Sequence, residues 1–440
     1  TTKPTVTSAP QPTTTTTPPI RKPGSLPDPS KPEGTETLEQ IQHIVIVMQE
    51  NHSFDSYFGM LGRGDGFAVD AKGQPRDANP VGDGTFVRAF HWPGECQVSG
   101  LPGQDWGRSH TSWNNGRNDG FVKASTGVAM GYWDETDIPF YYALARTFPV
   151  CDRWFCSTLA QTYPNRRFLM AGTAAGIVLT SAPSLSISPP PNGTILDRLA
   201  RHKITWKNYF TDLPGTAVIP QEIGPYPKSL ANISEFARDA AAGKLPAISY
   251  VDPNFTHESE ENPQDIRRGE NFTHNVVQAL FDSPLWPKSL LIFCYDEHGG
   301  YYDHVPPPRA IPPDHIKPGV DDPTVHGAYD HYGFRVPAVI VSPYAKRDYV
   351  SHVVHDQTSI LKLIETKWNL PAMTYRDANA DNLLDSLDFA NPPAFLEPPK
   401  LPGPGALGTC EEGVTKSPVP PANAIVSASE ASSLRIGATS

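Results

Sequence analysis

The sequence predicts an α/β fold in which helices cover both faces of a mostly parallel central sheet. Five short apolar runs are typical of strands buried on both faces, and helical patterns lie between them. The runs occupy residues 43–48, 204–210, 247–251, 290–295 and 336–342. Strands that alternate with helices indicate a layered sheet of this class. Proline accounts for 48 of the 440 residues, roughly twice its ordinary share, which predicts long loops.

Two of the helical patterns have clear ends. Residues 232–244 form a pattern that stops at a glycine, which is typical of a helix C-terminus. Residues 358–368 follow Asp356, a candidate N-cap, and we expect a helix there. Its helical period places four apolar side chains on one face: Ile360, Leu361, Ile364 and Trp368.

We expect one globular domain over residues 39–395, flanked by two tails. Residues 1–38 are mostly Thr, Pro, Ser and Lys, and residues 396–440 are rich in Pro, Gly and Ser. Neither end has the apolar periodicity needed to offset the conformational entropy that an ordered chain loses.

Charge and glycosylation motifs bear on the cellular location. The net charge of −11 argues against nonspecific binding to nucleic acid, and no run of about 18 apolar residues predicts a membrane span. No signal peptide is visible, and a start at Thr1 favours a mature form from which one has been removed. Asn-x-Ser/Thr motifs begin at Asn51, Asn192, Asn232, Asn254 and Asn271. With the Thr/Pro-rich tail, they predict a secreted eukaryotic glycoprotein modified at Asn192, Asn232, Asn254 and Asn271; chance matches in a polar chain are the alternative.

Five cysteines leave at least one thiol unpaired. Cys294 lies inside an apolar run, so we expect it to be the buried free thiol. The other four allow three pairings, between which the sequence does not choose: Cys96, Cys151, Cys156 and Cys410. Disulfides are plausible in a secreted protein.

Polar side chains follow three of the predicted strands. Residues 49–52 read Gln-Glu-Asn-His, residues 296–298 read Asp-Glu-His, and Asp252 and His257 follow the run at 247–251. In open α/β sheets, ligands bind outside the carboxyl ends of the strands, so we expect these groups to share one crevice. Clustered carboxylates repel one another unless a cation compensates them. Carboxylate and imidazole donors together predict a divalent metal, with Zn²⁺ favoured.

Thr162 is a candidate nucleophile. Pro164 and the apolar residues that follow it predict a short helix, which places Thr162 just before the helix N-terminus. Backbone N–H groups at that end favour an anion, and a metal would favour deprotonation of the hydroxyl. The alternative is that Thr162 is an ordinary N-cap.

Three segments of the chain read HIVIVMQENHSFDSYFGML, QTYPNRRF and DEHGGYYDHVPPP. They resemble the signature blocks of the phospholipase C / acid phosphatase family, the phosphoesterase branch of the alkaline phosphatase superfamily, and they occur in the family's order between about residues 40 and 370. The resemblance implies an alkaline-phosphatase-like sheet and a phosphoesterase catalytic domain, here of a secreted fungal enzyme.

The resemblance also implies roles for individual residues. The implied metal ligands are Glu50, Asn51, Thr162, Asp296 and Glu297, with Thr162 as the nucleophile. His110 and, on a looser match, His257 are implied to contact the phosphoryl group, and with His298 they are our candidates for the general acid. We expect Asn165 and His304 to contact substrate, although His304 suits a loop-ordering role equally well.

One position departs from the family pattern. An Asp-His-Thr-Ser run is expected before the last helix, and Gln357 occupies the place of its histidine in HDQTSILKLIE. His352 or His355 could substitute, or no histidine is needed. A second metal held by Asp252, His257 and one of these two would then be conceivable.

The implied reaction is phosphoester hydrolysis in two steps through a phosphorylated Thr162. We favour a phospholipase C that acts on phospholipid at a lipid interface and releases diacylglycerol; an acid phosphatase acting on soluble monoesters is the alternative. Residues 131–150 are rich in Trp, Tyr and Phe, and either line an entry for a choline headgroup or acyl chain or pack in the core. We expect a monomer.

Two other classes remain open. A sulfatase-like hydrolase shares the implied fold, but its modified nucleophile comes from Cys or Ser, and Thr162 holds the matching position here. A non-catalytic wall or adhesion protein would suit the Thr/Pro-rich tail, but candidate ligands in every block argue against it.

Overall fold

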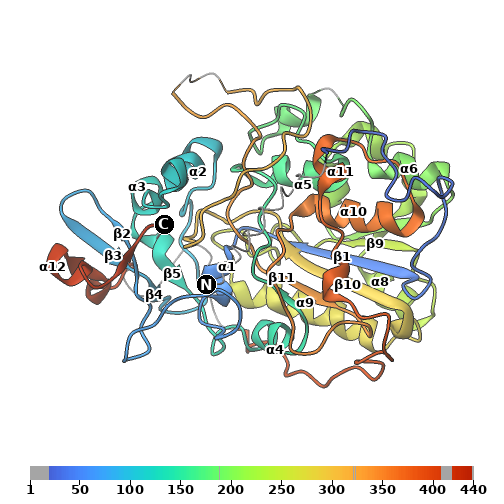
Figure 1. Cartoon of the computed structure of the whole chain (residues 1–440). Coiled ribbons are helices and arrows are strands. Elements are labelled where there is room, and N and C mark those ends of the chain that lie inside the picture. Colours follow the sequence, from blue (N-terminus) through green and yellow to red (C-terminus); the bar gives the residue numbers. More distant parts are fainter. Residues whose placement is uncertain (1–18, 188, 321, 323, 408–418, 439–440) are drawn as a thin grey trace, which may run out of the picture.

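A computed structural model of the chain describes residues 19–187, 189–320, 322, 324–407 and 419–438. Its centre is an eight-stranded sheet in the order β12-β6-β11-β10-β1-β9-β7-β8. Helices cover both faces: α5 and α10 lie on one side, and α4 and α9 on the other (Figure 1). The predicted α/β class is therefore confirmed.

The bounds of the sheet strands are β1 His43–Gln49, β6 Val150–Cys151, β7 Trp206–Phe210, β8 Leu230–Asn232, β9 Ile248–Val251, β10 Ser289–Tyr295, β11 Ala338–Val341 and β12 Val350–Ser351. The other strands are β2 Asp77–Pro80, β3 Thr85–Arg88, β4 Phe90–His91, β5 Gly131–Tyr132, β13 Ile425–Ser427 and β14 Arg435–Ile436. The first six helices are α1 Phe54–Phe58, α2 Trp106–Trp113, α3 Phe121–Ser125, α4 Pro139–Thr147, α5 Thr162–Ala171 and α6 Ile195–Arg201. The last six are α7 Pro220–Ile223, α8 Ser234–Ala241, α9 Ile266–Phe281, α10 Gln357–Trp368, α11 Tyr375–Asn379 and α12 Ala428–Ala431.

All five predicted strands form, and the sheet is mostly parallel. Strand β1 pairs in parallel with β10 on one side and with β9 on the other. Strand β11 is the exception, because it runs antiparallel to both β10 and β6. The prediction of a parallel strand there is wrong in direction: residues 296–337 connect β10 to β11 without an α-helix among the described residues, and a parallel neighbour needs such a crossover.

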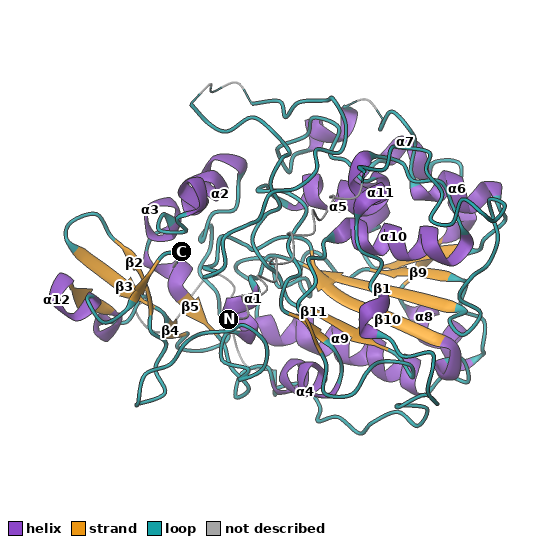
Figure 2. Cartoon of the chain, viewed as in Figure 1, coloured by secondary structure: helices purple, strands orange, loops and turns teal. Residues whose placement is uncertain are grey.

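The register brings the carboxyl ends of three neighbouring strands to one edge (Figure 2). Gln49, the last residue of β1, pairs with Tyr295, the last residue of β10, and Val47 pairs with Val251 at the end of β9. The polar residues that follow these strands therefore emerge side by side.

The predicted helices are confirmed, with shifted ends. Helix α10 begins after Asp356, whose carboxylate accepts a hydrogen bond from the Thr358 backbone N–H at 3.1 Å. Its four predicted apolar residues are all buried. The pattern at 232–244 contains α8, which is shorter because β8 extends to Asn232.

The described parts of the two Pro-rich ends lie on the body of the protein. The backbone of Thr37 bonds to Lys367 at the end of α10, and that of Gly24 bonds to Ala372. At the other end, β13 pairs with β3 and β14 with β2 in a four-stranded sheet. Residues 1–18 and 408–418 lie outside the described residues, and the division at residues 38 and 396 stays a prediction.

The aromatic segment at 131–150 belongs to the core. Trp133, Tyr141 and Tyr142 are almost completely buried, and Trp133 stacks on Trp92. The Tyr141 hydroxyl donates a hydrogen bond to the carboxylate of Glu260 at 2.6 Å. Of the two readings of this segment, core packing is the one that the structure shows.

The cysteines differ from expectation. Cys294 is a buried free thiol, as predicted, but Cys151 and Cys156 are also buried and free. Two disulfides are therefore excluded, and Cys96 and Cys410 remain as candidates for one; Cys410 lies outside the described residues. No helix in the described part of the chain is long and apolar enough to cross a membrane.

Candidate active site

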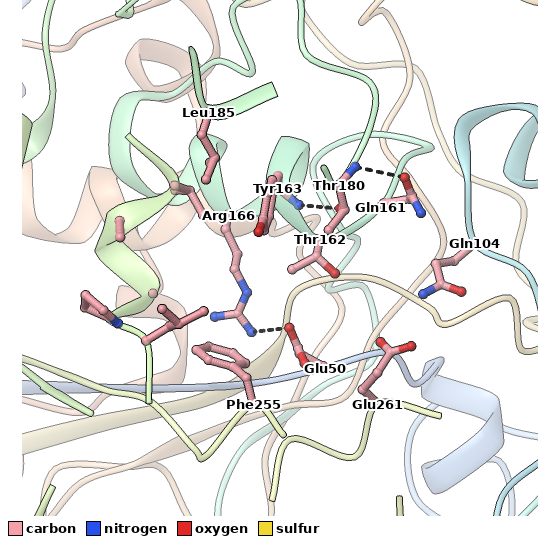
Figure 3. A pocket seen from close by; sticks show the side chains of 15 residues that line it. Glu50, Gln104, Gln161, Thr162, Tyr163, Arg166, Thr180, Leu185, Phe255 and Glu261 are labelled. Atoms are coloured by element: carbon pink, nitrogen blue, oxygen red, sulfur yellow. Dashed lines mark hydrogen bonds and ion pairs between the residues drawn. The ribbon is translucent and has the colours of Figure 1, made fainter. Parts of the chain in front are cut away.

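A cavity of about 420 Å³ opens at the edge where the strands end (Figure 3). Two predicted site residues line it, Glu50 after β1 and Thr162 at the start of α5. Glu261, which the sequence did not indicate, lines it from the loop after β9. Its lining residues are Glu50, Gln104, Gln161, Thr162, Tyr163, Arg166, Thr180, Leu185, Leu213, Pro214, Gly215, Ala217, Val218, Phe255 and Glu261.

Thr162 is the first residue of α5 rather than the residue before it. The helix starts there because Gln161 is extended, with φ −74° and ψ −174°. Asn165 stabilises the preceding loop: its side chain accepts from the Thr158 N–H at 3.0 Å and donates to the Ala160 carbonyl at 2.8 Å. At this helix start the Tyr163 N–H donates to the Thr180 hydroxyl at 3.0 Å and Pro164 has no N–H. Thr162 lies at the positive end of the helix dipole, where an anion is favoured.

Asn165 itself is fully buried and does not line the cavity. Its expected contact with substrate is replaced by a positioning role, because all of its polar atoms are engaged with the loop that leads to Thr162.

Arg166 ties the three strand ends together. Its guanidinium lies 3.0 Å from the Asp296 carboxylate, 3.6 Å from Glu50 and 3.9 Å from Asp252. These carboxylates follow β10, β1 and β9, which are consecutive in the sheet. Sequence reasoning missed Arg166, although it stands four residues after Thr162 and so on the same face of the helix.

The site carries more negative than positive charge. Burial is the main reason that the pKa values of Glu50, Asp296 and Glu297 are raised, and the Arg166 guanidinium opposes this for Glu50 and Asp296. Glu261 is half-buried at the cavity, and partial desolvation together with the Asp296 charge raises its pKa to about 7. A second cation would relieve this repulsion.

The predicted metal ligands fit a divalent cation. Asn51 is buried with neither side-chain oxygen nor nitrogen in a hydrogen bond, and Glu297 has one carboxylate oxygen without a partner. Buried polar atoms are normally paired, so unpaired oxygens at the strand ends suit a cation. The predicted ligands Glu50, Asn51, Thr162, Asp296 and Glu297 would all offer oxygen, which suits Mg²⁺, Ca²⁺ or Mn²⁺ as well as zinc. Only Glu50 and Thr162 among them line the cavity.

Gly299 lets the ligand segment approach β1. Its φ is +64°, and a Cβ at this position would lie 1.8 Å from the carbonyl oxygen of Asn51. The Gly299 N–H also donates to the Glu297 carboxylate at 2.8 Å. A glycine is therefore required where the loops bearing Asn51 and Glu297 touch.

The structure does not bring the predicted catalytic histidines into the cavity. None of the fourteen histidines, all within the described residues, lines it. His110 is on α2, where its Nδ1 is 2.7 Å from the Trp106 carbonyl oxygen, and His257 is exposed in the loop after β9. His298 is buried behind Glu297, 3.3 Å from its carboxylate, and burial lowers its pKa to about 3.

His304 lies in a buried ionic network instead of the cavity. Its Nδ1 is 2.7 Å from Asp55 and its Nε2 is 3.2 Å from Asp65, while Arg335 pairs with Asp55 at 3.0 Å. Burial alone would lower the His304 pKa, but the two carboxylates raise it to about 9. The loop-ordering alternative is the one that this geometry supports.

Gln357 supports the site from behind. Its amide donates to the Asp296 carbonyl at 2.8 Å and accepts from the Ser157 hydroxyl at 2.6 Å. Neither candidate substitute reaches the cavity: exposed His352 pairs with Asp152, and His355 pairs with Asp385. Asp252, His257 and one of these two histidines therefore do not form a second metal site.

An apolar wall faces the acidic groups. It consists of Leu185, Leu213, Pro214, Val218 and Phe255. This wall could not be predicted from sequence periodicity, because its residues come from separate loops and short helical turns.

The predicted glycosylation sites differ in exposure. Asn192 and Asn232 are exposed, whereas Asn254 and Asn271 are half-buried. Asn51 is buried in the candidate metal site.

Comparison with known proteins identifies the family. The model of the Phosphoesterase family matches residues 41–371. The chain belongs to the phosphoesterase family. It is therefore a phosphoric ester hydrolase, and the resemblance of the three motifs is confirmed.

Several curated relatives cover most of the chain. Phospholipase C B of Mycobacterium tuberculosis is 32% identical over 458 residues, which span 87% of this chain and 86% of that protein. Non-specific phospholipase C1 of Arabidopsis thaliana is 30% identical over 400 residues, spanning 82% and 74%. Among solved structures, an alkaline phosphatase superfamily protein from Vibrio parahaemolyticus aligns over 81% of this chain and 72% of its own, with 10% identity and a TM-score of 0.39.

We predict that Gly299→Ala impairs hydrolysis more than it impairs folding. The new Cβ displaces Asn51, and a shift of about 1 Å in a catalytic group can cost roughly a hundredfold in rate. Gly73→Ala is the matched control, because Gly73 has φ +75° but nothing within 4 Å of an added Cβ. In both variants the alanine at a positive φ lowers the free energy of unfolding, which is measured by urea unfolding. Equal hydrolysis of the diester p-nitrophenylphosphorylcholine by the two variants would contradict this.

We predict that His304 makes stability fall in mild alkali. Its folded pKa of about 9 lies above the ordinary unfolded value of about 6.5. The stabilisation is complete below pH 6.5 and is lost as the pH rises through 9, on the order of 3 kcal/mol. His304→Gln should remove this slope in urea unfolding, whereas His352→Gln at an exposed site should keep it. Parallel slopes for wild type and His304→Gln would exclude the effect.

Proposed function

We propose that the chain is a metal-dependent phospholipase C. It cleaves the glycerol-side phosphodiester bond of a phospholipid and yields diacylglycerol and a phosphorylated headgroup. The supporting observation is one cavity in which Thr162, at a helix start, faces acidic strand ends on one side and an apolar wall on the other (Figure 3). The relatives named as phospholipases C support the same substrate class.

The first step is attack of the Thr162 hydroxyl oxygen on phosphorus. A bond forms between this oxygen and phosphorus while the bond from phosphorus to the glycerol oxygen breaks. The Thr162 proton is released to solvent, and diacylglycerol leaves once its oxygen has been protonated. The positive end of the α5 dipole stabilises the negative charge on the phosphoryl oxygens. Water then attacks the phosphothreonine diester, releases the phosphorylated headgroup and restores the hydroxyl.

A divalent cation held by Glu50, Asn51, Thr162, Asp296 and Glu297 would act as a Lewis acid and favour the ionised hydroxyl. Arg166 keeps three of the surrounding strand ends in place.

The leaving glycerol oxygen needs a proton. Because no histidine of the described chain lines the cavity, we assign this role to Glu261, a lining carboxyl outside the proposed ligand set. Glu261 replaces His110, His257 and His298 as the candidate general acid.

The apolar wall is the reason for preferring phospholipid over a small monoester. The glycerol backbone and the first acyl carbons of a phospholipid can bury apolar surface against Leu185, Leu213, Val218 and Phe255. A soluble phosphomonoester has no such acyl carbons. We also propose that the protein is secreted, supported by the exposed glycosylation motifs at Asn192 and Asn232.

Product analysis tests the function. We expect diacylglycerol from phosphatidylcholine or phosphatidylethanolamine, lost on chelation and restored by a divalent cation. Thr162→Ala should lose roughly a thousandfold or more in kcat, and Thr162→Ser should keep part of it. Thr136→Ala, at an exposed threonine outside the cavity lining, should stay near wild type. Phosphate released from p-nitrophenyl phosphate without any diacylglycerol would identify an acid phosphatase instead.

Glu261→Gln tests whether Glu261 protonates the leaving oxygen, by comparing substrates whose leaving groups do and do not need a proton. We expect kcat on phosphatidylcholine to fall roughly a hundredfold or more, because an alkoxide leaves poorly without a proton. Hydrolysis of p-nitrophenylphosphorylcholine should change little, since p-nitrophenolate leaves unprotonated. Glu258→Gln, outside the cavity lining, is the control. Equal losses on both substrates would exclude Glu261 as the acid.

A further inference from the structure

A second group of metal-ligating side chains lies apart from the cavity, on the long connection between β10 and β11. It consists of His326, Asp330 and His331, whose ligand atoms all lie within 4.8 Å of one another. The three side chains are partly exposed, at 34%, 26% and 13%, so an ion from solvent can reach them. None of them lines the active-site cavity.

The two imidazoles point at the same carboxylate oxygen. His326 Nε2 is 2.6 Å and His331 Nδ1 is 2.9 Å from Asp330 Oδ1. In the absence of a cation, both ring nitrogens must carry a proton to make these contacts. A cation placed among the two nitrogens and the oxygen would replace both protons and bind all three groups.

A third imidazole stands beside this group. His110 on α2 has its ring centroid 5.7 Å from that of His326. Its Nδ1 faces the Trp106 carbonyl oxygen at 2.7 Å, so Nδ1 carries the proton and Nε2 keeps the lone pair. Metal-binding histidines are commonly oriented by such a contact to a backbone carbonyl.

Two tryptophans of helix α2 contact His326 and His331. The Trp113 ring packs 4.7 Å from the His331 ring, and the Trp106 indole N–H donates to the His326 carbonyl at 3.0 Å. The histidines are thus held by a regular element and are not loose on a surface loop.

Two similar groups in the described chain are poorer in imidazole. His91 with Asp134 and Asp137, and His355 with Asp381 and Asp385, each contain one histidine. Zinc prefers nitrogen ligands far more than Mg²⁺ or Ca²⁺ do, so a set with two histidines and a third nearby is the one suited to zinc.

We propose that His326, Asp330 and His331 form a zinc site, with His110 as the nearest further ligand. The site is separate from the all-oxygen active site and does not depend on the proposed reaction. It joins the β10–β11 connection to α2, just after Gln104 of the cavity lining. Arg309, 3.9 Å from the other Asp330 oxygen, is 83% exposed and free to turn away.

Zinc stoichiometry tests the proposal. Tag-free full-length protein is stripped with a chelator, titrated with Zn²⁺ and assayed by elemental analysis after gel filtration. The double variant His326→Ala/His331→Ala should bind one equivalent less than wild type, and His91→Ala should bind the same amount as wild type. Equal zinc content in the double variant and wild type would overturn the proposal.

X-ray absorption at the zinc edge keeps the test decisive if the double variant does not fold. Asp296→Asn/Glu297→Gln removes two ligands of the active site and leaves the histidine group intact. We expect zinc bound to this variant to show imidazole scattering from at least two histidines. An all-oxygen shell around the zinc bound to this variant would refute the site.

Discussion

The contact of Arg166 with three carboxylates is the interaction on which the site depends. Its guanidinium reaches Glu50, Asp252 and Asp296, which follow three consecutive strands of the sheet. Without it, three buried carboxylates would face one another, and loss of one partner from a buried ionic group typically costs about 3–5 kcal/mol. Arg166 lies one helical turn after Thr162, so the contact that gathers the strand ends also sets how α5 presents the hydroxyl.

A second layer of contacts holds the loops that carry the acidic groups. Gln357 bonds to the backbone of Asp296, and Gly299 allows the Asn51 carbonyl to come close. Beneath Glu261, the buried carboxylate of Glu260 accepts hydrogen bonds from Tyr57, Tyr141 and Tyr295 at 2.6–2.7 Å. These bonds anchor a backbone with φ 71° at Glu260, which directs the next residue to the cavity. The aromatic core therefore positions the active site without lining it.

The sequence predicted what depends on local pattern. The apolar runs identified the strands, and the polar residues after them identified Glu50, Asn51, Asp296 and Glu297 as neighbours. It could not place His110 or His298, because the direction of a side chain depends on tertiary packing: one ring packs on Trp106, the other behind Glu297 between Phe121 and Phe334. The role of Arg166 could not be predicted either, because its partners Glu50, Asp252 and Asp296 lie 116, 86 and 130 residues away along the chain.

The charge of the cavity limits what can bind there. A phosphodiester is an anion, and Glu50 and Glu261 line the same cavity, so the ligand would be repelled if these carboxylates were uncompensated. Arg166 is already shared among three acidic groups and leaves little positive charge for substrate. The helix start at Thr162 provides only partial charges. A further cation at the strand ends, where Asn51 and Glu297 hold unpaired oxygens, would offset this repulsion and favour an anionic substrate.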